Sequence, residues 1–416
     1  MTAQSKLRIL HIVHQYLPDK VGGTEPYTRT LARHQVAQGH EVAVFAPSAS
    51  STSATPTLED GVRVYRIPVT GRSATAVFLS TFRQPHLNHA FEVCLQHENP
   101  NIIHIQHLMG LPVSLVADIQ AARIPYLVTL HDYWYLCANA QLITNYDETI
   151  CEGPDWWLNC ARCALARSGH AKAYPAIPVL APLFALREAK LKSVLEQAHR
   201  LISPTYFTKS IYEGMGIDGK KIKVVGHGIQ LPTKMPEPQA HDDFHIAYIG
   251  GISWQKGIHV LIEAVNQLPT EDVQLSIIGD LTDFPDYAAQ LQTQATHPGI
   301  HFRGRLSHDQ LWQALTTVDV VVVPSLWYET ASLIVQEAFA AKVPVIASNI
   351  GALQERVADG INGRLVPLDN SDILRDTLRT FLDNPLELAE YRRNVQPVRR
   401  IEDHINDLDL IYQSIK

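Results

Sequence analysis

Short apolar runs alternate with longer amphipathic stretches along most of the chain, a pattern that predicts strands followed by helices. The first unit opens with LRILHIVH at residues 7–14, passes through the loop QYLPDKVGG and enters a helical stretch from Thr24 to about Gln38. The apolar run EVAVFAPS follows at residues 41–48. Strand, loop, helix and strand in this order predict a βαβ unit with parallel strands.

The same alternation continues through both halves of the chain. Further strands are expected at residues 62–69, 101–107, 125–132, 199–205 and 221–228, and then at 244–251, 273–280, 300–304, 320–325, 344–348 and 363–368. Near-continuous apolar strands are typical of parallel sheets covered by helices on both faces. We therefore expect an α/β protein with two doubly wound parallel-sheet domains, which bind ligands outside the carboxyl ends of their strands.

Residues 231–243 interrupt this alternation. The segment LPTKMPEPQAHDD holds three prolines and three acidic residues between two strand runs, which indicates an interdomain linker. We expect an N-terminal domain over residues 1–230, a C-terminal domain over residues 244–395, and a last helix over residues 396–416 that returns to the N-terminal domain.

Composition narrows the class of protein. The 416 residues carry 35 Lys and Arg against 42 Asp and Glu, a formal net charge of −7, so no basic excess favours nucleic acid as a partner. The longest uncharged apolar run, residues 173–186, contains three prolines and is shorter than the roughly 20 residues of a membrane span. With no signal-peptide pattern before Leu7 and an odd number of cysteines, we expect a cytoplasmic enzyme.

Two segments match ligand-binding motifs in sequence, but the secondary structure predicted around them does not fit ligand binding. GMGIDG at residues 214–219 fits G-x-G-x-x-G, but a helical stretch precedes it and a strand follows, the reverse of a dinucleotide-binding loop. We interpret it as a helix-ending turn, which argues against a dinucleotide oxidoreductase. DLD at residues 407–409 lies in an amphipathic run and is expected to form a solvated helix face.

Two predicted helix starts carry residues suited to a phosphate. Gly22 and Gly23 precede the first helix, with Thr24 placed to cap it, and backbone amides there can approach an anion closely. A plain tight turn explains the glycines equally well.

In SLWYETASLIVQEAFAAKVPVIAS, Glu329 stands at an expected helix start and Glu337 follows eight residues later. That is a rise of about 12 Å, the span from a sugar across a diphosphate to a ribose, with two surface glutamates as the alternative.

The spacing Glu-x7-Glu within PSLWYETASLIVQEAFAAKVPVIASNIGALQERVADGINGRLV resembles the signature of family-4 retaining glycosyltransferases. Further stretches agree in order and spacing: residues 7–47, LHD at 130–132, VVGHGI at 224–229 and YIGGISWQKGIHVLIEAV at 248–265. The resemblance extends from Leu7 to about Pro385. It implies the GT-B fold, in which two Rossmann-like domains face each other across a cleft and the second binds most of a nucleotide sugar.

The resemblance also implies roles for individual residues. Glu329 would contact the donor sugar, Glu337 the ribose hydroxyls, and Lys256 the diphosphate. His131 would lie beside the reacting centre, so that His131, Lys256 and Glu329 are the expected catalytic residues. The other expected donor-binding residues are Gly22, Gly23, Gly251, Arg305, Ala331, Ser332, Leu333 and Ile334.

Two positions depart from the family pattern. Gly251 stands where the family usually has an arginine, with Arg303 and Arg29 as candidate replacements, and His227 stands where the family turn often has asparagine.

The implied reaction transfers a glycosyl group, with retention, from a UDP- or GDP-sugar to a hydroxyl of a saccharide or lipid-linked acceptor in polysaccharide or glycolipid biosynthesis. No catalytic metal ion is expected. The alternatives are a nucleotide-sugar epimerase of the same fold and a non-catalytic protein that binds a sugar nucleotide or a partner.

A cysteine-rich insert spans residues 137–163. Cys137, Cys151, Cys160 and Cys163 suit a structural zinc ion or, less readily, an iron–sulfur cluster. Scattered buried thiols, as expected for Cys94, are the alternative interpretation. A closed site of four thiolates would hold an acceptor-side loop in place.

The apolar run at residues 173–186 leads into Arg187. It fits peripheral contact with the inner face of a membrane. A proline-broken loop packed on the first domain is the alternative.

Overall fold

The computed structural model describes residues 6–19, 22–70, 73–269 and 271–416. The chain forms two compact units, one of Met1–Gly226 together with Ile401–Lys416 and the other of His227–Arg400. In the part of the chain that the structure describes, none of the helices combines the length and apolar character of a membrane-spanning segment.

The first unit is built on an eight-stranded sheet with the order β3-β4-β2-β1-β5-β6-β7-β8. Its strands are β1 (Arg8–Ile12), β2 (Glu41–Ser48), β3 (Thr57–Glu59), β4 (Val62–Pro68), β5 (Ile102–Ile105), β6 (Tyr126–Thr129), β7 (Arg200–Ser203) and β8 (Ile222–Val224). All neighbours pair in parallel except β3 and β4. The direction of strand addition reverses between β1 and β5, so the loops after these two strands diverge there.

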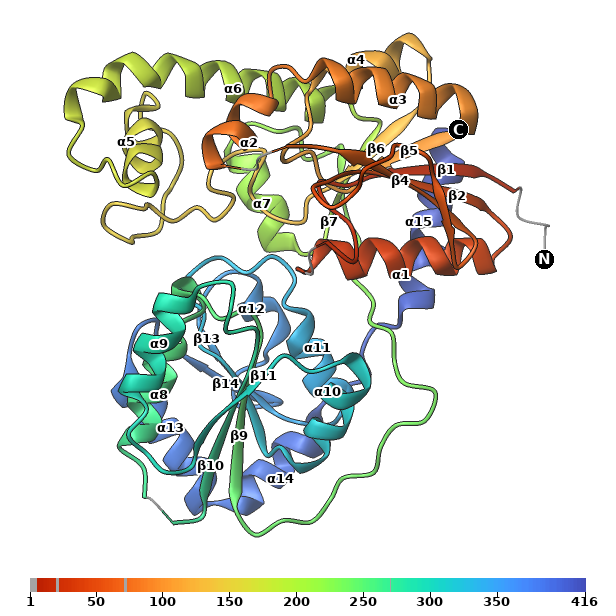
Figure 1. The fold of residues 1–416 in the computed structure, drawn as a ribbon. Coiled ribbons are helices and arrows are strands. Elements are labelled where there is room, and N and C mark those ends of the chain that lie inside the picture. The colour runs from red at the N-terminus through yellow and green to blue at the C-terminus, as the bar shows by residue number, and fades with distance from the viewer. Residues whose placement is uncertain (1–5, 20–21, 71–72, 270) are drawn as a thin grey trace. The chain divides into compact units, whose positions relative to one another are not determined.

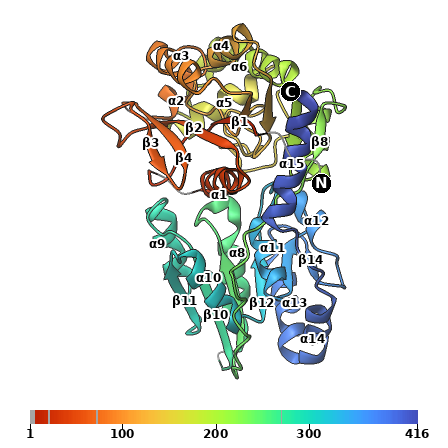
Figure 2. The same cartoon turned by 90° about the vertical axis from the view of Figure 1, so that its right-hand side faces the viewer.

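Helices cover both faces of this sheet. They are α1 (Thr24–Ala37), α2 (Ala74–Ser80), α3 (Pro85–Glu98), α4 (Ser114–Ala121), α5 (Leu158–Arg167), α6 (Ile177–Gln197), α7 (Tyr206–Gly214) and the C-terminal α15 (Ile401–Ile415). Figure 1 shows α1 and α15 on one face and α3, α4 and α6 on the other. Figure 2 again places α15 beside the sheet of this unit, where Leu408 and Tyr412 are fully buried against Leu31 of α1.

The second unit is a six-stranded parallel sheet with the order β11-β10-β9-β12-β13-β14. The strands are β9 (Phe244–Ile249), β10 (Val273–Ile278), β11 (Ile300–Gly304), β12 (Val320–Val323), β13 (Val345–Ser348) and β14 (Gly363–Val366). Numbered within the unit this is 3-2-1-4-5-6, the order of a dinucleotide-binding Rossmann sheet. The point where the order reverses lies between β9 and β12, and ligands of such sheets bind outside the strand ends there.

The helices of the second unit are α8 (Ile258–Asn266), α9 (Pro285–Gln294), α10 (His308–Ala314), α11 (Leu333–Ala340), α12 (Ala352–Arg356), α13 (Ser371–Asp383) and α14 (Pro385–Asn394). Short 3-10 turns occupy Tyr174–Ala176, Trp254–Lys256 and Leu315–Thr317 in the two units. Figure 1 shows α8, α9 and α13 on one face of the second sheet and α10, α11 and α14 on the other.

Two sequence-based expectations are wrong at the level of local structure. The proline-broken loop considered for residues 173–186 is wrong, because Tyr174–Ala176 form a 3-10 turn and the residues from Ile177 onward lie in the 21-residue helix α6. Pro178 lies in its first turn, where a missing N–H costs nothing, and Pro182 is tolerated one turn later. The DLD segment is only partly solvated, since Asp409 is fully buried with its carboxylate 3.5 Å from Nε2 of His40.

The GMGIDG segment behaves as expected. Helix α7 ends at Gly214, and Gly216 has a left-handed backbone (φ +84°) before the chain enters β8. The motif is therefore a helix-ending turn, where glycine adopts the left-handed conformation without strain.

Candidate active site

In the second unit, the turn after β9 is pressed against the loop after β12. The backbone N–H of Leu326 donates to the carbonyl of Gln255 at 2.8 Å. Gly257 has a left-handed backbone (φ +67°), and a Cβ there would stand 1.9 Å from the carbonyl oxygen of Pro324. Only glycine fits so close an approach, so the Lys256–Gly257 turn is held directly over the loop that carries Glu329.

Lys256 and Glu329 form a tightly held ion pair at this point. Nζ of Lys256 lies 2.7 Å from Oε1 of Glu329, and the same oxygen accepts from Oγ of Ser325 at 2.7 Å and from Nε1 of Trp327 at 3.0 Å. Glu329 is buried. Burial raises the pKa of Glu329, but the charge of Lys256 and the three hydrogen bonds outweigh it and bring the pKa below its usual value. The carboxylate is therefore ionised at neutral pH and fixes the position of the ammonium group.

Helix α11 begins later than the sequence pattern predicts. Its first residue is Leu333, and Ser332 before it has a left-handed backbone (φ +46°). Glu329 and Ala331 therefore lie in a loop and not in the helix, so the eight-residue helical rise between the two glutamates is wrong. The amides of Leu333 and Ile334 do belong to the first turn, where unpaired N–H groups favour an anion.

Glu337, on the second turn of α11, has an unusual carboxyl group. Burial raises its pKa from 4.5 to about 7. The group is therefore close to half-protonated at neutral pH, and a ligand that donates hydrogen bonds to its carboxylate form would draw it toward ionisation.

The two arginines considered as replacements at Gly251, Arg303 and Arg29, lie in different places. Arg303 is exposed near the end of β11, and β10 separates that strand from β9. Arg305, expected to bind the donor, follows β11 directly and is half-buried. Arg29 forms an ion pair with Asp60 at 3.3 Å within the first unit. Gly251 itself is exposed, and a Cβ built on it meets no atom within 4 Å, so its backbone does not require glycine.

In the first unit, the glycine loop before α1 is organised by a buried carboxylate. Gly23 occupies the N-cap position without a side-chain cap, so Thr24 is the first helical residue and not the cap expected. The backbone N–H of Gly22 donates to Oε2 of Glu25 at 2.8 Å, and Nε2 of Gln15 donates to Oε1. A phosphate contact by Gly22 would require Glu25 to move away, whereas the expected contact by Gly23 stays a prediction.

His131 follows β6 and is held by a glutamine. Its Nε2 lies 2.8 Å from Oε1 of Gln106, and burial lowers its pKa to about 3. Because an amide oxygen can only accept, the neutral ring carries its proton on Nε2 and presents Nδ1 as an acceptor. Nε2 of Gln106 in turn donates to Nδ1 of His11 at 3.1 Å, and His11 donates through Nε2 to Gln35 at 2.7 Å.

This chain of hydrogen bonds continues to the C-terminal helix. Nε2 of Gln35 donates to the hydroxyl of Tyr412 at 3.2 Å. That hydroxyl lies 2.7 Å from Nδ1 of His104, whose Nε2 lies 2.7 Å from Oγ1 of Thr129. Every member accepts one bond and donates the next, so a single orientation of protons is consistent from His131 to α15.

Sequence reasoning missed several polar residues beside the predicted ones. Nε2 of His107 lies 3.1 and 3.0 Å from the two carboxylate oxygens of Asp132. Burial raises the pKa of Asp132, but the charge and hydrogen bond of His107 outweigh it and lower the pKa overall. Glu25, Gln106 and His107 have no motif of their own. The signal that could have found them is their position, directly after β5 for Gln106 and His107 and in the first turn of α1 for Glu25.

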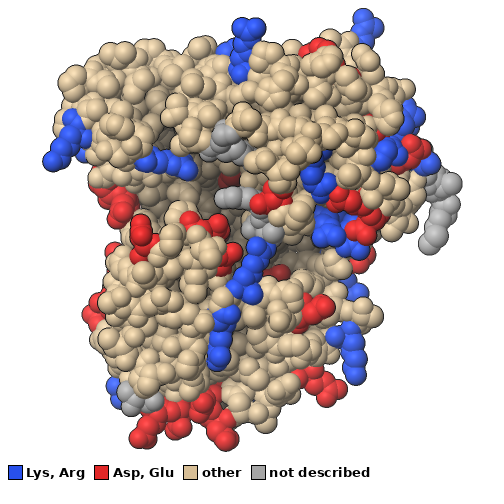
Figure 3. All heavy atoms as spheres, viewed as in Figure 1, with Lys and Arg blue, Asp and Glu red and all other residues tan. Residues whose placement is uncertain are grey.

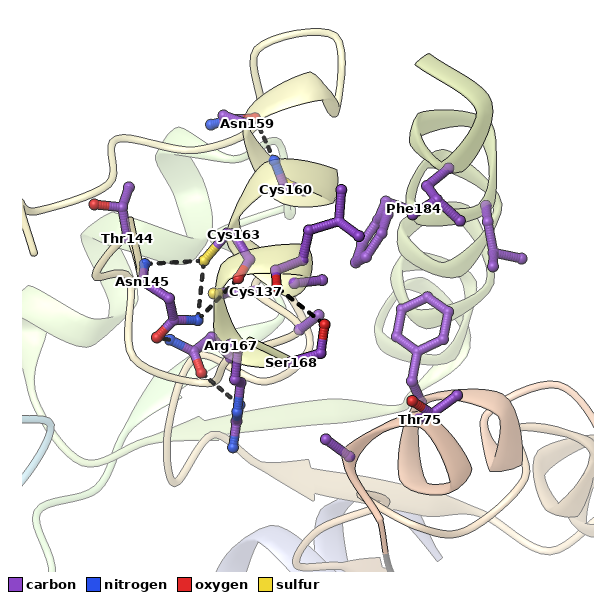
Figure 4. Close-up of a pocket in the computed structure, with 18 of the residues that line it drawn as sticks. Thr75, Cys137, Thr144, Asn145, Asn159, Cys160, Cys163, Arg167, Ser168 and Phe184 are labelled. Carbon is purple, nitrogen blue, oxygen red and sulfur yellow. Dashed lines mark hydrogen bonds between the residues drawn. The ribbon is translucent and has the colours of Figure 1, made fainter. Parts of the chain in front are cut away.

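The four cysteines of the insert line one cavity of about 310 Å³ in the first unit (Figure 4). Among the residues that the structure describes, no three Cys, His, Asp or Glu side chains are grouped so as to hold a metal ion. The tetrahedral zinc site expected from the sequence is therefore not formed by the side chains as they stand.

A Rossmann sheet with a lysine–glutamate pair at its switch point, in a chain that also forms a second, largely parallel-sheet unit, defines a protein of the GT-B fold class. The chain matches two family models, "Glycosyl transferase 4-like domain" over residues 22–228 and "Glycosyl transferases group 1" over residues 233–397. The protein belongs to the family-4 glycosyltransferases.

Relatives agree with this assignment over most of their length. An uncharacterized glycosyltransferase of Methanocaldococcus jannaschii is 25% identical over 378 residues, covering 88% of this chain and 86% of that protein. A glycogen synthase of Mycobacterium tuberculosis is 26% identical over 398 residues, covering 91% and 87%.

Solved structures show the same fold. Sucrose-phosphate synthase from Thermosynechococcus elongatus has a TM-score of 0.75 at 20% identity and 98% coverage of both chains. Anabaena HepE in complex with UDP-glucose has a TM-score of 0.68 at 17% identity, covering 98% of this chain and 99% of that one.

Proposed function

We propose that the protein is a retaining hexosyltransferase that moves a sugar from a UDP- or GDP-sugar to a hydroxyl of a saccharide or lipid-linked acceptor. The observation that carries this proposal is the ion pair between half-buried Lys256 and buried Glu329 at the switch point of the second sheet. It places a fixed cation and an ionised acceptor of hydrogen bonds where such sheets bind nucleotides.

Lys256 would stabilise the leaving diphosphate. Negative charge grows on this group as the glycosidic bond of the donor breaks, and a cation already held in position needs no reorganisation at that moment. The amides of Leu333 and Ile334 at the start of α11 would bind the same phosphates. Glu329 would hold Lys256 through Oε1 and contact hydroxyls of the donor sugar, while Glu337 would accept hydrogen bonds from the ribose.

No side chain of the protein is proposed as a nucleophile. The departing phosphate would accept the proton of the incoming acceptor hydroxyl on the same face of the sugar, which accounts for retention. His131, neutral and with its proton on Nε2, would orient the donor sugar through Nδ1 without adding a positive charge.

We take the acceptor to be a saccharide, free or lipid-linked, because named relatives include a phosphatidyl-myo-inositol mannosyltransferase of Mycolicibacterium smegmatis, 24% identical over 386 residues.

Cytoplasmic location and peripheral membrane contact stay predictions. The apolar side chains of Val179 and Leu186 are exposed on α6, and flotation of the protein with anionic lipid vesicles would test the membrane contact.

The test begins with a thermal-shift screen of UDP- and GDP-sugars, since a ligand of the native state raises Tm. Turnover is then measured with the donor found, with and without an acceptor mixture. Lys256→Ala and Glu329→Ala are each expected to lower kcat/KM at least ~100-fold, or about 2.7 kcal/mol, whereas Lys234→Ala, an exposed lysine in the linker, should leave it unchanged.

The products separate the alternatives. An anomeric configuration equal to that of the donor, read by NMR, supports retention. Donor consumption without acceptor and with a changed sugar configuration would identify an epimerase, and donor binding without any turnover would identify a sugar-nucleotide-binding protein.

A further inference from the structure

A cavity of about 310 Å³ lies between α2, α5 and α6 in the first unit. We call it the α5–α6 cavity. Figure 4 shows Phe184 of α6 on the side facing α5, with Thr75 of α2 at the lower end. The lining residues Leu79 and Arg167 are exposed, whereas Ile143 and Phe184 are buried. The cavity is therefore open where α2 meets the end of α5, and its inner wall is shielded from water.

Most of the side chains around the cavity are apolar. Leu180, Leu183 and Phe184 line it from one face of α6, and Leu165 lines it from α5. Phe78 of α2 packs on Phe184 with ring centroids 4.9 Å apart. A volume of this size with a mainly apolar lining is typical of sites that bind small molecules.

Two of the cysteines in the wall add to this apolar lining. Burial raises the pKa of Cys160 to about 12 and the pKa of Cys163 to about 11. Both side chains are therefore neutral thiols at neutral pH. A neutral thiol behaves as a small, polarisable apolar group, so these cysteines suit contact with a hydrocarbon ligand.

The polar side chains of the wall already have partners within the protein. Nδ2 of Asn145 donates to Sγ of Cys163 at 3.2 Å, and Nδ2 of Asn159 donates to the carbonyl of Gly153 at 2.8 Å. Among the described residues that line the cavity, no buried side-chain nitrogen or oxygen lacks a hydrogen-bond partner. A polar ligand would lose its bonds to water inside without replacing them, so the occupant of the interior should be apolar.

The opening of the cavity carries a positive charge. Arg167, in the last turn of α5, is exposed and is the one charged side chain among the described residues of the lining. Its Nη1 donates to Oδ1 of Asn139, a neutral group. Residues 156–187 hold four basic residues and no Asp or Glu, in a chain with a net charge of −7. This local charge favours an anion, and a guanidinium group binds phosphate oxygens in a bidentate manner.

The outer face of α6 is apolar as well. Val179 is 76% exposed and Leu186 is 49% exposed, and the exposed Pro182 lies between them on the same face. The surface over α5 and α6 carries few charged side chains (Figure 3). A helix that is apolar on opposite faces is normally buried. Helix α6 thus presents apolar side chains both to the cavity and to its surroundings, as expected of a helix that lies against lipid.

We propose that the α5–α6 cavity binds the hydrocarbon chain of a lipid phosphate, with Arg167 paired to the phosphate at the opening. An acyl lipid and an isoprenoid phosphate share this chemistry. The inference goes beyond sugar transfer and does not depend on it, because occupancy of the cavity requires neither a donor nor turnover. If the proposed function also holds, the chain of a lipid-linked acceptor would be anchored here.

The experiment measures binding of decyl phosphate to the full-length protein by calorimetry, below the concentration at which this probe forms micelles. Burial of one CH₂ group changes affinity about fourfold, so decyl phosphate should bind at least ~10-fold more tightly than octyl phosphate. Arg167→Ala should weaken binding of decyl phosphate at least ~10-fold and leave binding of decanol unchanged.

A matched pair of variants tests the location of the site. Ala164 of α5 lines the cavity, so Ala164→Trp should fill it and abolish saturable binding. Ala189→Trp, at an exposed position of α6 outside the lining, should bind as the wild type does. Geranyl phosphate, which also has ten carbons, separates the sources: the chain that binds more tightly names an isoprenoid or an acyl lipid, and either result supports the site.

A second measurement covers the case in which Ala164→Trp fails to fold. In the wild-type protein, saturating decyl phosphate should slow alkylation of Cys160 and Cys163 by a maleimide at least ~10-fold, because the chain covers their thiols. Cys94, fully buried in α3, serves as the internal reference for unfolding. Absence of saturable binding, unchanged alkylation rates at saturation, or wild-type binding by folded Ala164→Trp would each overturn the proposal.

Discussion

Glu337 offers a direct test of the physical reasoning about the second unit. Burial raises its pKa from 4.5 to about 7, so the folded protein holds this proton at pH values where the unfolded chain has lost it. The contribution of Glu337 to stability is therefore fully present below pH 4.5, falls as the pH rises and is lost above about pH 7. Each pKa unit corresponds to 1.36 kcal/mol, so the shift amounts to about 3 kcal/mol.

Replacing Glu337 with glutamine removes the ionisation but keeps the size of the side chain. We expect the Glu337→Gln variant to melt close to wild type at pH 4.5 and higher than wild type at pH 8. For a unit of this size, about 3 kcal/mol corresponds to a rise of roughly 6–12 °C. The measurement is the Tm of the transition of the second unit across this pH range, with Glu263→Gln, an exposed glutamate on α8, as the control.

The affinity for the donor should change with pH in the opposite direction to the stability contribution of Glu337. A ribose diol donates hydrogen bonds to a carboxylate, so the affinity for a nucleotide sugar should rise about tenfold between pH 6 and pH 8 in the wild type. In Glu337→Gln it should be lower and independent of pH. An equal Tm change at pH 4.5 and pH 8 would refute the burial argument, and a pH-independent wild-type affinity would refute the assignment of Glu337 to the ribose.

Three further substitutions test other parts of the structure. Gly257→Ala should destabilise the second unit by at least ~2 kcal/mol in urea unfolding, because its Cβ would stand 1.9 Å from the carbonyl oxygen of Pro324; a wild-type midpoint would contradict the close approach. Gly251→Arg should keep the wild-type Tm, since a Cβ there meets no atom within 4 Å, and should tighten nucleotide-sugar binding in calorimetry by supplying a second phosphate cation; a large loss of Tm would be unexpected. Gln106→Leu should lower kcat roughly tenfold with little change in donor KM, because His131 and His11 lose their partner, and unchanged kcat in steady-state kinetics would remove Gln106 as a positioning residue.

The sequence by itself determined the fold class and the family of this protein. Alternating apolar strands and amphipathic helices require parallel sheets covered on both faces, because each apolar stripe must be buried against the next layer. Lys256 and Glu329 could be paired as candidates because their loops follow strands of one predicted Rossmann sheet and match a known motif. These conclusions rest on short-range patterns, which do not depend on how distant segments pack.

Only the tertiary structure decided features that depend on single backbone angles or on distant partners. The left-handed Ser332 delays the start of α11, and no periodicity reveals it. The buried Asp409 is set against His40, although its local sequence reads as a solvated helix face. The hydrogen-bond chain from His131 to Tyr412 includes a bond between Gln35 and Tyr412, which stand 377 positions apart in the sequence. Whether a polar side chain is solvated or buried with a partner depends on which elements pack together, and that is decided by the whole fold.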